Sequence, residues 1–265
     1  MTDRPSQDLC VKIKFMILRK DTDSIAILEI QHGKVNALDV ELCAALDESL
    51  ESIERSAAKA IVLTGSGTTF SAGVDLFRLL QGGTRYAQEF VPKLVNALKR
   101  LFIFPKPVVV AINGNAIAGG CVIACACDYR VAIKGRGKIG VPEALVGVPF
   151  PSTAFEIVRF ATDPRRLQEV VYFGRYYDME EGVALGFVDE TVDAEKLLDR
   201  AMEIAERLSQ IPADTFRLIK AHLRAPYLAT IEQSTLREEE IEKVWMSGEI
   251  HTVIRDYLQR TVGKK

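Results

Sequence analysis

An unusually apolar run of 19 residues, 108–126, limits what this chain can fold into more than any other feature. A run of this length would span a bilayer as a helix. However, Asn113-Gly114 and Gly119-Gly120 interrupt it with residue pairs that are typical of turns, and charged residues follow it at once. The run therefore predicts a buried strand, a turn and a buried helix, and it argues against a membrane partner.

The composition is that of an ordinary globular protein. The chain has 265 residues, of which 48% are hydrophobic and 26% charged, and its 34 basic and 36 acidic residues give a formal net charge of −2. This profile excludes the collagen-like, disordered and disulfide-scaffold classes. A charge so close to zero also argues against a broad basic face for nucleic acid or an anionic membrane. The composition says nothing about chemistry.

The cysteines indicate a reducing compartment. There are five, an odd number, and Cys121, Cys125 and Cys127 lie in or next to the apolar run. Such cysteines usually behave as small buried hydrophobic residues. No histidine lies near them in the sequence to complete a zinc site, so we expect no metal. The first residues are polar and lack the apolar core of a signal peptide, which favours a cytoplasmic protein.

Hydrophobic periodicity predicts strands and helices that alternate along the first part of the chain. The expected strands cover 11–19, 24–31, 59–64, 107–112, 129–133, 138–141 and 187–192, with a turn at 21–23. One helix is expected after Asp39, a plausible N-cap, another covers 86–101, and helical periodicity dominates from residue 152 onward. This order predicts an α/β core followed by a helical part, without a clear linker between them.

Two glycine-containing turns follow two of the apolar strands. The first lies within 69–76 and the second within 112–121, where it leads into a helix. Small residues let a backbone approach a ligand closely, and a helix N-terminus presents N–H groups that have no intrahelical partner. Two such groups pointing at one place would form an oxyanion hole. Spacing alone leaves a second interpretation open, in which both are simply tight turns in a well-packed sheet.

The segments 70–76 and 113–120 resemble those of the crotonase, or enoyl-CoA hydratase/isomerase, superfamily. Three further segments are similar to motifs of the same superfamily: Lys34-Val35-Asn36-Ala37-Leu38, Pro142-Glu143 followed by Gly147, and Ala184-Leu185-Gly186-Phe187-Val188-Asp189. The resemblance runs from about residue 11 to the C-terminus. Each motif is weak singly, but five in the correct order and spacing are specific.

The resemblance implies an α/β fold, a crotonase-like spiral of repeated ββα units with a helical C-terminal trimerisation region. Residues 1–193 would form the spiral core with an acyl-CoA site, and 194–265 the helical oligomerisation region. The implied partner is a small-molecule substrate, a coenzyme A thioester, and no separate cofactor is implied. The implied assembly is a homotrimer or a dimer of trimers.

The resemblance also implies roles for individual residues. The backbone N–H groups of Val74 and Gly119 would form the oxyanion hole, and Glu143 would be the catalytic acid and base. The substrate-binding residues would be Lys34, Ala37, Ala72, Asp75, Gly120 and Val122. Without the resemblance, Glu143 would be an ordinary surface acid, Asp75 would close a turn and Lys34 would face water. Phe77 stands where many relatives have a lysine near the CoA nucleotide.

One position separates the activities of this superfamily. Its hydratases use two glutamates, and the first of these falls at Val122, whose side chain cannot move a proton. Moving a double bond needs one base that removes a proton and returns it elsewhere, whereas adding water is best served by two carboxylates. Among Val122, Leu145 and Val146, we expect the pKa of Glu143 to be raised. The chain therefore looks most like the superfamily's Δ3,Δ2-enoyl-CoA isomerases, which keep only the later glutamate.

Two alternatives stay open. One is an enoyl-CoA hydratase of fatty acid β-oxidation, in which Glu143 alone, or an acid from an expected loop at 76–89, is sufficient. The other, from a different class, is a non-catalytic acyl-CoA-binding protein that has kept the fold. Other chemistry of the superfamily and the acyl chain length are also open, because periodicity does not locate the loop residues that line an acyl pocket.

Overall fold

A computed structural model describes residues 16–22 and 24–261 of the chain. Its main element is a six-stranded sheet with the strand order β1-β2-β3-β5-β7-β9. The bounds of these strands are β1 Ile17–Thr22, β2 Ile25–Ile30, β3 Ala60–Gly65, β5 Val108–Ile112, β7 Tyr129–Ile133 and β9 Glu190–Val192. Only β1 and β2 pair antiparallel, and every later neighbour pair is parallel. Parallel neighbours need a crossover between them, which the helices supply.

A second, parallel sheet of three short strands stands beside the first. It consists of β4 Thr69–Ser71, β6 Asn115–Ile117 and β8 Ile139–Gly140. Along the chain, a strand of the large sheet, a strand of the small sheet and a helix follow one another three times, as β3-β4-α2, β5-β6-α3 and β7-β8-α4. The predicted repeat of ββα units is therefore confirmed.

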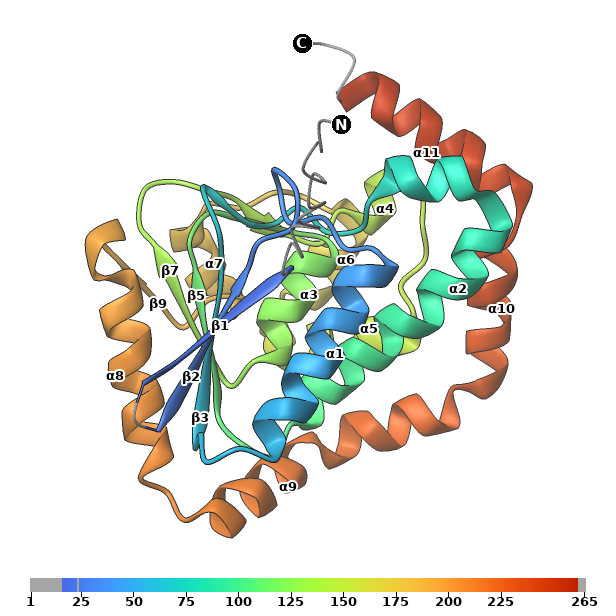
Figure 1. Cartoon of the computed structure of the whole chain (residues 1–265). Helices are drawn as coiled ribbons and strands as arrows, with labels where there is room; N and C mark the ends of the chain where they lie inside the picture. The colour runs from blue at the N-terminus through green and yellow to red at the C-terminus, as the bar shows by residue number, and fades with distance from the viewer. Residues whose placement is uncertain (1–15, 23, 262–265) are drawn as a thin grey trace, which may run out of the picture.

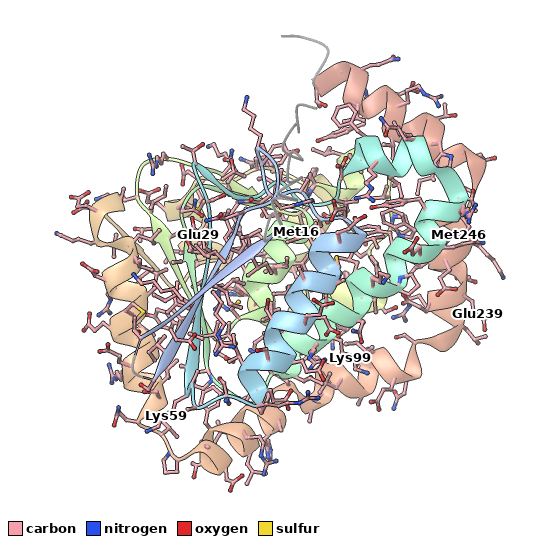
Figure 2. All side chains as sticks on the ribbon, viewed as in Figure 1. Met16, Glu29, Lys59, Lys99, Glu239 and Met246 are labelled. Atoms are coloured by element: carbon pink, nitrogen blue, oxygen red, sulfur yellow. The ribbon has the colours of Figure 1, made fainter. Side chains whose placement is uncertain are left out.

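Helices cover both faces of the large sheet (Figure 1). Helices α1 (Val40–Glu54), α2 (Leu76–Ile103) and α3 (Gly119–Ala126) lie over one face, and α8 (Leu197–Ser209) packs against the other. Strand β5 is covered on both sides, so all five of its residues are buried. This explains why 108–112 is continuously apolar instead of alternating. Side chains fill the space between the sheet and its helices (Figure 2).

The last part of the chain is helical. After β8 come α4 (Glu143–Val146), α5 (Ser152–Ala161), α6 (Leu167–Phe173) and α7 (Met179–Leu185), and a short 3₁₀ turn, η1 (Ala194–Lys196), leads into α8. Helices α9 (Ala213–Gln233), α10 (Thr235–Trp245) and α11 (Gly248–Thr261) then pass around the core, and α11 packs against α2 and α4 (Figure 1). The division of the chain at residue 193 stays a prediction, and α8, which follows it, packs on the sheet.

The element boundaries differ from the expected ones in three places. Strand β1 runs through Thr22, which pairs with Ile25, so the chain reverses later than the turn expected at 21–23. Residues 11–15 of the expected first strand lie outside the described residues. The helix expected at 86–101 lies in the second part of α2, which follows a kink at the non-helical Gly83 (φ 59°). The first part begins at Leu76, where the side chain of Asp75 accepts a hydrogen bond from the Arg78 N–H and caps the helix. The expected strand at 187–192 is limited to β9.

The apolar run forms the predicted buried strand, β5, and the predicted buried helix, α3, and between them it also forms the short strand β6, which was not predicted. No helix in the described part of the chain is long and apolar enough to cross a membrane. Cys43, Cys121, Cys125 and Cys127 are free and buried, which confirms the expectation of buried thiols at these four positions. Cys10 lies outside the described residues.

Candidate active site

A large cavity of about 610 Å³ opens between the two glycine turns, α2, α4 and α11. Its walls are mainly apolar, with Leu94 and Leu98 from α2, Val148 and Phe150 from the segment after α4, and Trp245 and Leu258 from the last two helices. An apolar pocket of this size with a few polar groups is the usual form of a small-molecule site. The polar groups in it are therefore the candidates for chemistry.

The two glycine turns meet at one edge of this cavity. Gly73 has φ of 81°, a left-handed conformation that glycine adopts without strain. A Cβ on Gly73 would lie 2.6 Å from the carbonyl oxygen of Ile117 and 3.1 Å from the amide nitrogen of Gly119. No side chain fits in that gap. A glycine at position 73 therefore allows the turn after β4 to pack directly on the turn before α3.

The N–H groups of Val74 and Gly119 have no hydrogen-bond acceptor among the described residues. The groups beside Val74 are paired with Leu38, whose N–H donates to Gly73 O at 2.7 Å and whose carbonyl accepts from Asp75 N at 2.9 Å. Gly119 begins α3, where backbone N–H groups lack intrahelical partners. Both residues line the cavity. Two unpaired donors at one site can stabilise an oxygen that gains negative charge.

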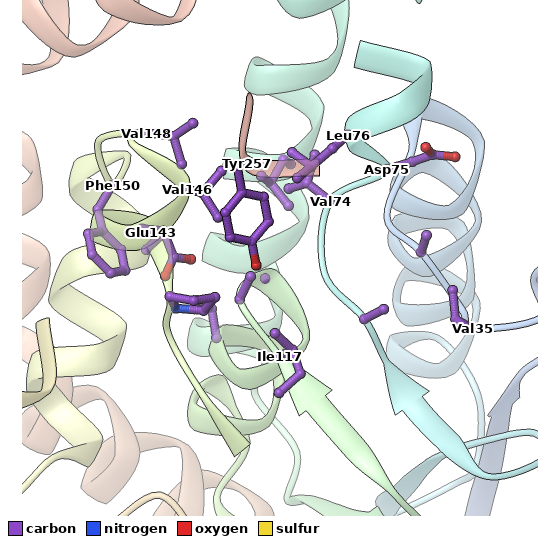
Figure 3. Close-up of a pocket in the computed structure, with 18 of the residues that line it drawn as sticks. Val35, Val74, Asp75, Leu76, Ile117, Glu143, Val146, Val148, Phe150 and Tyr257 are labelled. Atoms are coloured by element: carbon purple, nitrogen blue, oxygen red, sulfur yellow. The ribbon is translucent and has the colours of Figure 1, made fainter. Parts of the chain in front are cut away.

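Glu143, at the start of α4, is buried in the same cavity, with 8% of its surface exposed. Its Oε2 atom has no partner within the described part of the chain. Burial raises the pKa of Glu143 to about 8, although a hydrogen bond from its own backbone N–H acts in the opposite direction. Figure 3 shows its carboxylate among Val146, Val148 and Phe150. Glu143 is thus a desolvated acid in a pocket and not the surface acid of the simpler interpretation.

Val122 and Val146 are the apolar neighbours that were expected around this carboxylate. Val122 is 1% exposed and lines the cavity, as does Val146. Leu145 was also expected there, and this expectation is wrong. It is 48% exposed and does not line the cavity, because the single turn of α4 directs successive side chains to different sides.

The structure brings together four of the six expected substrate-binding residues. Ala37, Ala72, Asp75 and Val122 line the cavity. Lys34 and Gly120 do not: Lys34 is exposed on the loop before α1, and Gly120 is buried inside the first turn of α3. Phe77 lines the cavity and is 54% exposed.

Carboxylates are scarce at this site. Glu143 and Asp75 are the two carboxylates that line the cavity, and the Asp75 side chain caps α2. No acid of 76–89 lines it, because this stretch forms two helical pieces joined by a kink at Gly83, and its one acid, Glu89, is exposed. No group of three or more metal-ligating side chains occurs in 16–22 and 24–261.

Sequence reasoning did not find two tyrosines and a tryptophan that line the cavity. Tyr176 lies between α6 and α7, and Trp245 and Tyr257 belong to α10 and α11. The ring of Tyr257 points into the pocket (Figure 3). The helical spacing of Ile250, Ile254 and Tyr257 indicates a packed face, but it gives no sign of what this face covers.

Comparison with known proteins agrees with this geometry. A family model described as Enoyl-CoA hydratase/isomerase matches residues 20–261. The enoyl-CoA delta isomerase 1 of Rattus norvegicus mitochondria is 26% identical over 215 residues, which are 80% of this chain and 74% of that protein. The short-chain-enoyl-CoA hydratase of Clostridium acetobutylicum is 27% identical over 201 residues, 75% of this chain and 76% of that protein.

A solved structure has a closely similar fold. The human mitochondrial delta3-delta2-enoyl-CoA isomerase superposes with a TM-score of 0.88 over 94% of this chain and 99% of its own, at 24% identity. At this identity, the likeness concerns the fold alone. Of the two named relatives, one is named as an isomerase and the other as a hydratase, and the family model covers nearly the whole chain. The chain therefore belongs to the enoyl-CoA hydratase/isomerase family of enzymes.

Proposed function

We propose that this enzyme is a Δ3,Δ2-enoyl-CoA isomerase in which Glu143 alone moves the proton. The observation that carries the proposal is a buried carboxylate, Glu143, that lines the same cavity as two unpaired N–H groups. Val122 stands where hydratases of the family have their first glutamate, and Asp75 is used as a helix cap. The name of the rat relative, an enoyl-CoA delta isomerase, agrees with this assignment.

The reaction follows from these groups. The N–H groups of Val74 and Gly119 hold the thioester oxygen of a 3-enoyl-CoA. The ionised Glu143 takes a proton from C2, and the electron pair of that C–H bond moves into the thioester to give a dienolate. Glu143 then returns the proton to C4, which leaves the double bond between C2 and C3. No atom is gained or lost, so one acid/base group is sufficient.

A hydratase is the second candidate, since the relative from Clostridium acetobutylicum carries this name. Adding water requires a place that holds the water and a group that delivers a proton to carbon. Besides Glu143, the carboxylate that lines the cavity is Asp75, and its side chain caps α2 and is not free to deliver that proton. A non-catalytic acyl-CoA-binding protein is the third candidate, and it would need neither the burial nor the raised pKa of Glu143.

The assembly and location that we propose are a homotrimer, or a dimer of trimers, in the cytoplasm. Helix α9 exposes Leu218, Ile219 and Leu223, which are large apolar side chains suited to contact between copies. The free, buried cysteines are typical of a reducing compartment.

The test uses 3-enoyl-CoA and 2-enoyl-CoA as separate substrates for the wild type and for Glu143→Gln. We expect the wild type to convert 3-enoyl-CoA to 2-enoyl-CoA and the variant to lose this activity. Conversion of 2-enoyl-CoA to 3-hydroxyacyl-CoA by the wild type would instead identify a hydratase. Binding of either thioester with no turnover would identify the non-catalytic protein.

A further inference from the structure

The hydroxyl groups of two tyrosines that line the active-site cavity form a hydrogen bond, and Tyr176 is 41% exposed. The hydroxyl oxygens of Tyr176 and Tyr257 are 2.8 Å apart, although the residues are 81 positions apart in the sequence. Tyr176 lies between α6 and α7, and Tyr257 lies on α11. Both residues line the cavity that holds Glu143. The pair thus brings hydroxyl groups to a wall that is otherwise mainly apolar.

One hydroxyl hydrogen of this tyrosine pair is not used in the bond between the two residues. Each tyrosine hydroxyl donates one hydrogen bond, and the bond between the two uses one of the two hydrogens. The other has no acceptor within the described residues. Two other polar side chains of the cavity are already paired: Trp245 Nε1 donates to Pro149 O at 3.1 Å, and Thr261 Oγ1 donates to Tyr257 O at 2.8 Å.

The carboxylate of Glu143, in contrast, has an oxygen atom without a hydrogen-bond donor. Its Oε2 atom is buried without a donor, and Val122 and Val146 supply none. Since burial raises the pKa of Glu143 to about 8, its protonated form predominates at pH 7. A base has to be ionised, and a buried carboxylate without a hydrogen-bond donor ionises at a large cost in free energy.

The ionisable groups around Glu143 are few. Burial and the charge of Glu143 raise the pKa values of Cys121 in α3 and of Tyr176. Tyr257, Asp75 and Lys138 also line the cavity. Burial, the bond with Tyr257 and the nearby charge of Glu143 together raise the pKa of Tyr176. The Tyr176 hydroxyl therefore stays protonated, and able to donate, throughout the pH range in which Glu143 ionises.

We propose that the hydroxyl hydrogen left free by the Tyr176–Tyr257 bond is donated through one water to the ionised carboxylate of Glu143, which neither hydroxyl contacts directly. Tyr176 and Tyr257 are then positioning residues that make the isolated carboxylate usable as a base. Hydratases of the family have another glutamate at the position of Val122. Here the two tyrosine hydroxyls take over part of its role, because the side chain of Val122 forms no hydrogen bond. The inference rests on the proposed role of Glu143 and adds a device that holds and stabilises it.

The test measures the ionisation of Glu143 without any substrate. Protein labelled with ¹³C at the glutamate carboxylates is titrated by NMR, and the Glu143 signal is assigned by its loss in Glu143→Gln. Tyr176→Phe, Tyr257→Phe and the double variant remove the hydroxyls but keep the rings. Tyr177→Phe is the matched control, because Tyr177 is buried, its hydroxyl has no partner among the described residues, and it does not line the cavity.

The double variant should raise the pKa of Glu143 by about one unit, which lowers the ionised fraction about tenfold at pH 7. The single variant that matches this shift identifies the hydroxyl that donates to Glu143. Tyr177→Phe should leave the pKa unchanged. If the double variant also leaves it unchanged, the proposal is wrong and the pair serves only to hold α11 in place.

Kinetics separates this proposal from the proposed function. With 3-enoyl-CoA at pH 7, the double variant should lower kcat about tenfold and change KM less than twofold, and its pH–rate profile should move upward by the same one unit. If the wild type does not isomerise the substrate but the NMR shift is seen, the isomerase assignment fails and the role of the tyrosines stands. A lower kcat with an unshifted profile contradicts the role of the tyrosines.

Discussion

The Asp128 carboxylate lies 2.7 Å from Nζ of Lys220, and this ion pair ties the C-terminal helices to the segment that forms the active site. Asp128 follows α3, the helix that begins at Gly119, and also accepts a hydrogen bond from Val108 N at 2.8 Å. Arg224, one turn further along α9, reaches the other carboxylate oxygen at 2.8 Å. One partly buried acid, with 12% of its side chain exposed, thus holds two buried cations of α9 against the end of α3.

Asp128→Asn should destabilise the protein strongly. The substitution leaves Lys220 and Arg224 buried without a counter-charge, and breaking a buried ion pair typically costs about 3–5 kcal/mol of unfolding free energy. Denaturant unfolding measures this loss. Asp193→Asn is the control, since its pair with Lys196 is exposed and such pairs contribute less than about 1 kcal/mol. Equal losses for the two variants would contradict the role given to Asp128.

Gly73→Ala should disrupt the contact between the two turns. Its Cβ would collide with Ile117 O, so the N–H groups of Val74 and Gly119 would no longer meet at one place. We expect kcat/KM for 3-enoyl-CoA to fall by about 10²–10³, the usual effect of losing one oxyanion donor. Gly67→Ala has a similar left-handed φ of 68° but nothing within 4 Å, so it controls for backbone strain and should keep its activity. Similar kcat/KM values for the two variants would show that the contact is not needed.

The burial of Glu143 should be visible in the stability of the protein. Folding raises the pKa of Glu143 from its ordinary value near 4.5 to about 8, so between these values the folded protein binds a proton that the unfolded chain has lost. Stability from this group is therefore complete below pH 4.5 and falls by roughly 1.4 kcal/mol per pH unit up to about pH 8. Relative to the wild type, Glu143→Gln should gain stability over this range, measured by urea unfolding at several pH values. A constant difference would mean that Glu143 ionises normally.

The same ionisation should control the reaction rate. Since kcat/KM reports the pKa values of the free enzyme, it should rise about tenfold per pH unit up to about pH 8 and then level off. Initial rates with 3-enoyl-CoA from pH 6 to pH 9.5 measure this profile. A profile that is flat over this range would show that Glu143 is not the base.

Local patterns were sufficient to predict much of the fold and part of the site. Asp39 caps α1, with its side chain accepting from Leu42 N, as its position before an apolar periodicity suggested. The strand and turn pattern of 108–120 predicted that a helix begins after the second glycine turn. The resemblance to the family predicted that Glu143 and Val74 belong to the active site. These features depend on neighbours in the sequence or on a recognisable motif.

Contacts between distant segments could not be predicted in this way. Tyr257 lines the cavity because α11 folds back onto α2 and α4, and no local pattern encodes that path. Arg224 is 2% exposed, although a charged residue on a helix normally indicates a solvent-facing position. The partner that makes its burial tolerable, Asp128, lies 96 residues away. Leu145 was wrongly predicted to line the cavity, because the direction of its side chain depends on the single turn of α4.

The central claim, that one shielded carboxylate carries the proton from C2 to C4, is tested most directly with 3-enoyl-CoA deuterated at C2. The reaction is run in ordinary water, and mass spectrometry locates deuterium in the 2-enoyl-CoA product. We predict that a substantial share of the product carries deuterium at C4 and that Glu143→Gln forms no such product. Product with only solvent hydrogen at C4, or 3-hydroxyacyl-CoA in place of 2-enoyl-CoA, would contradict this account.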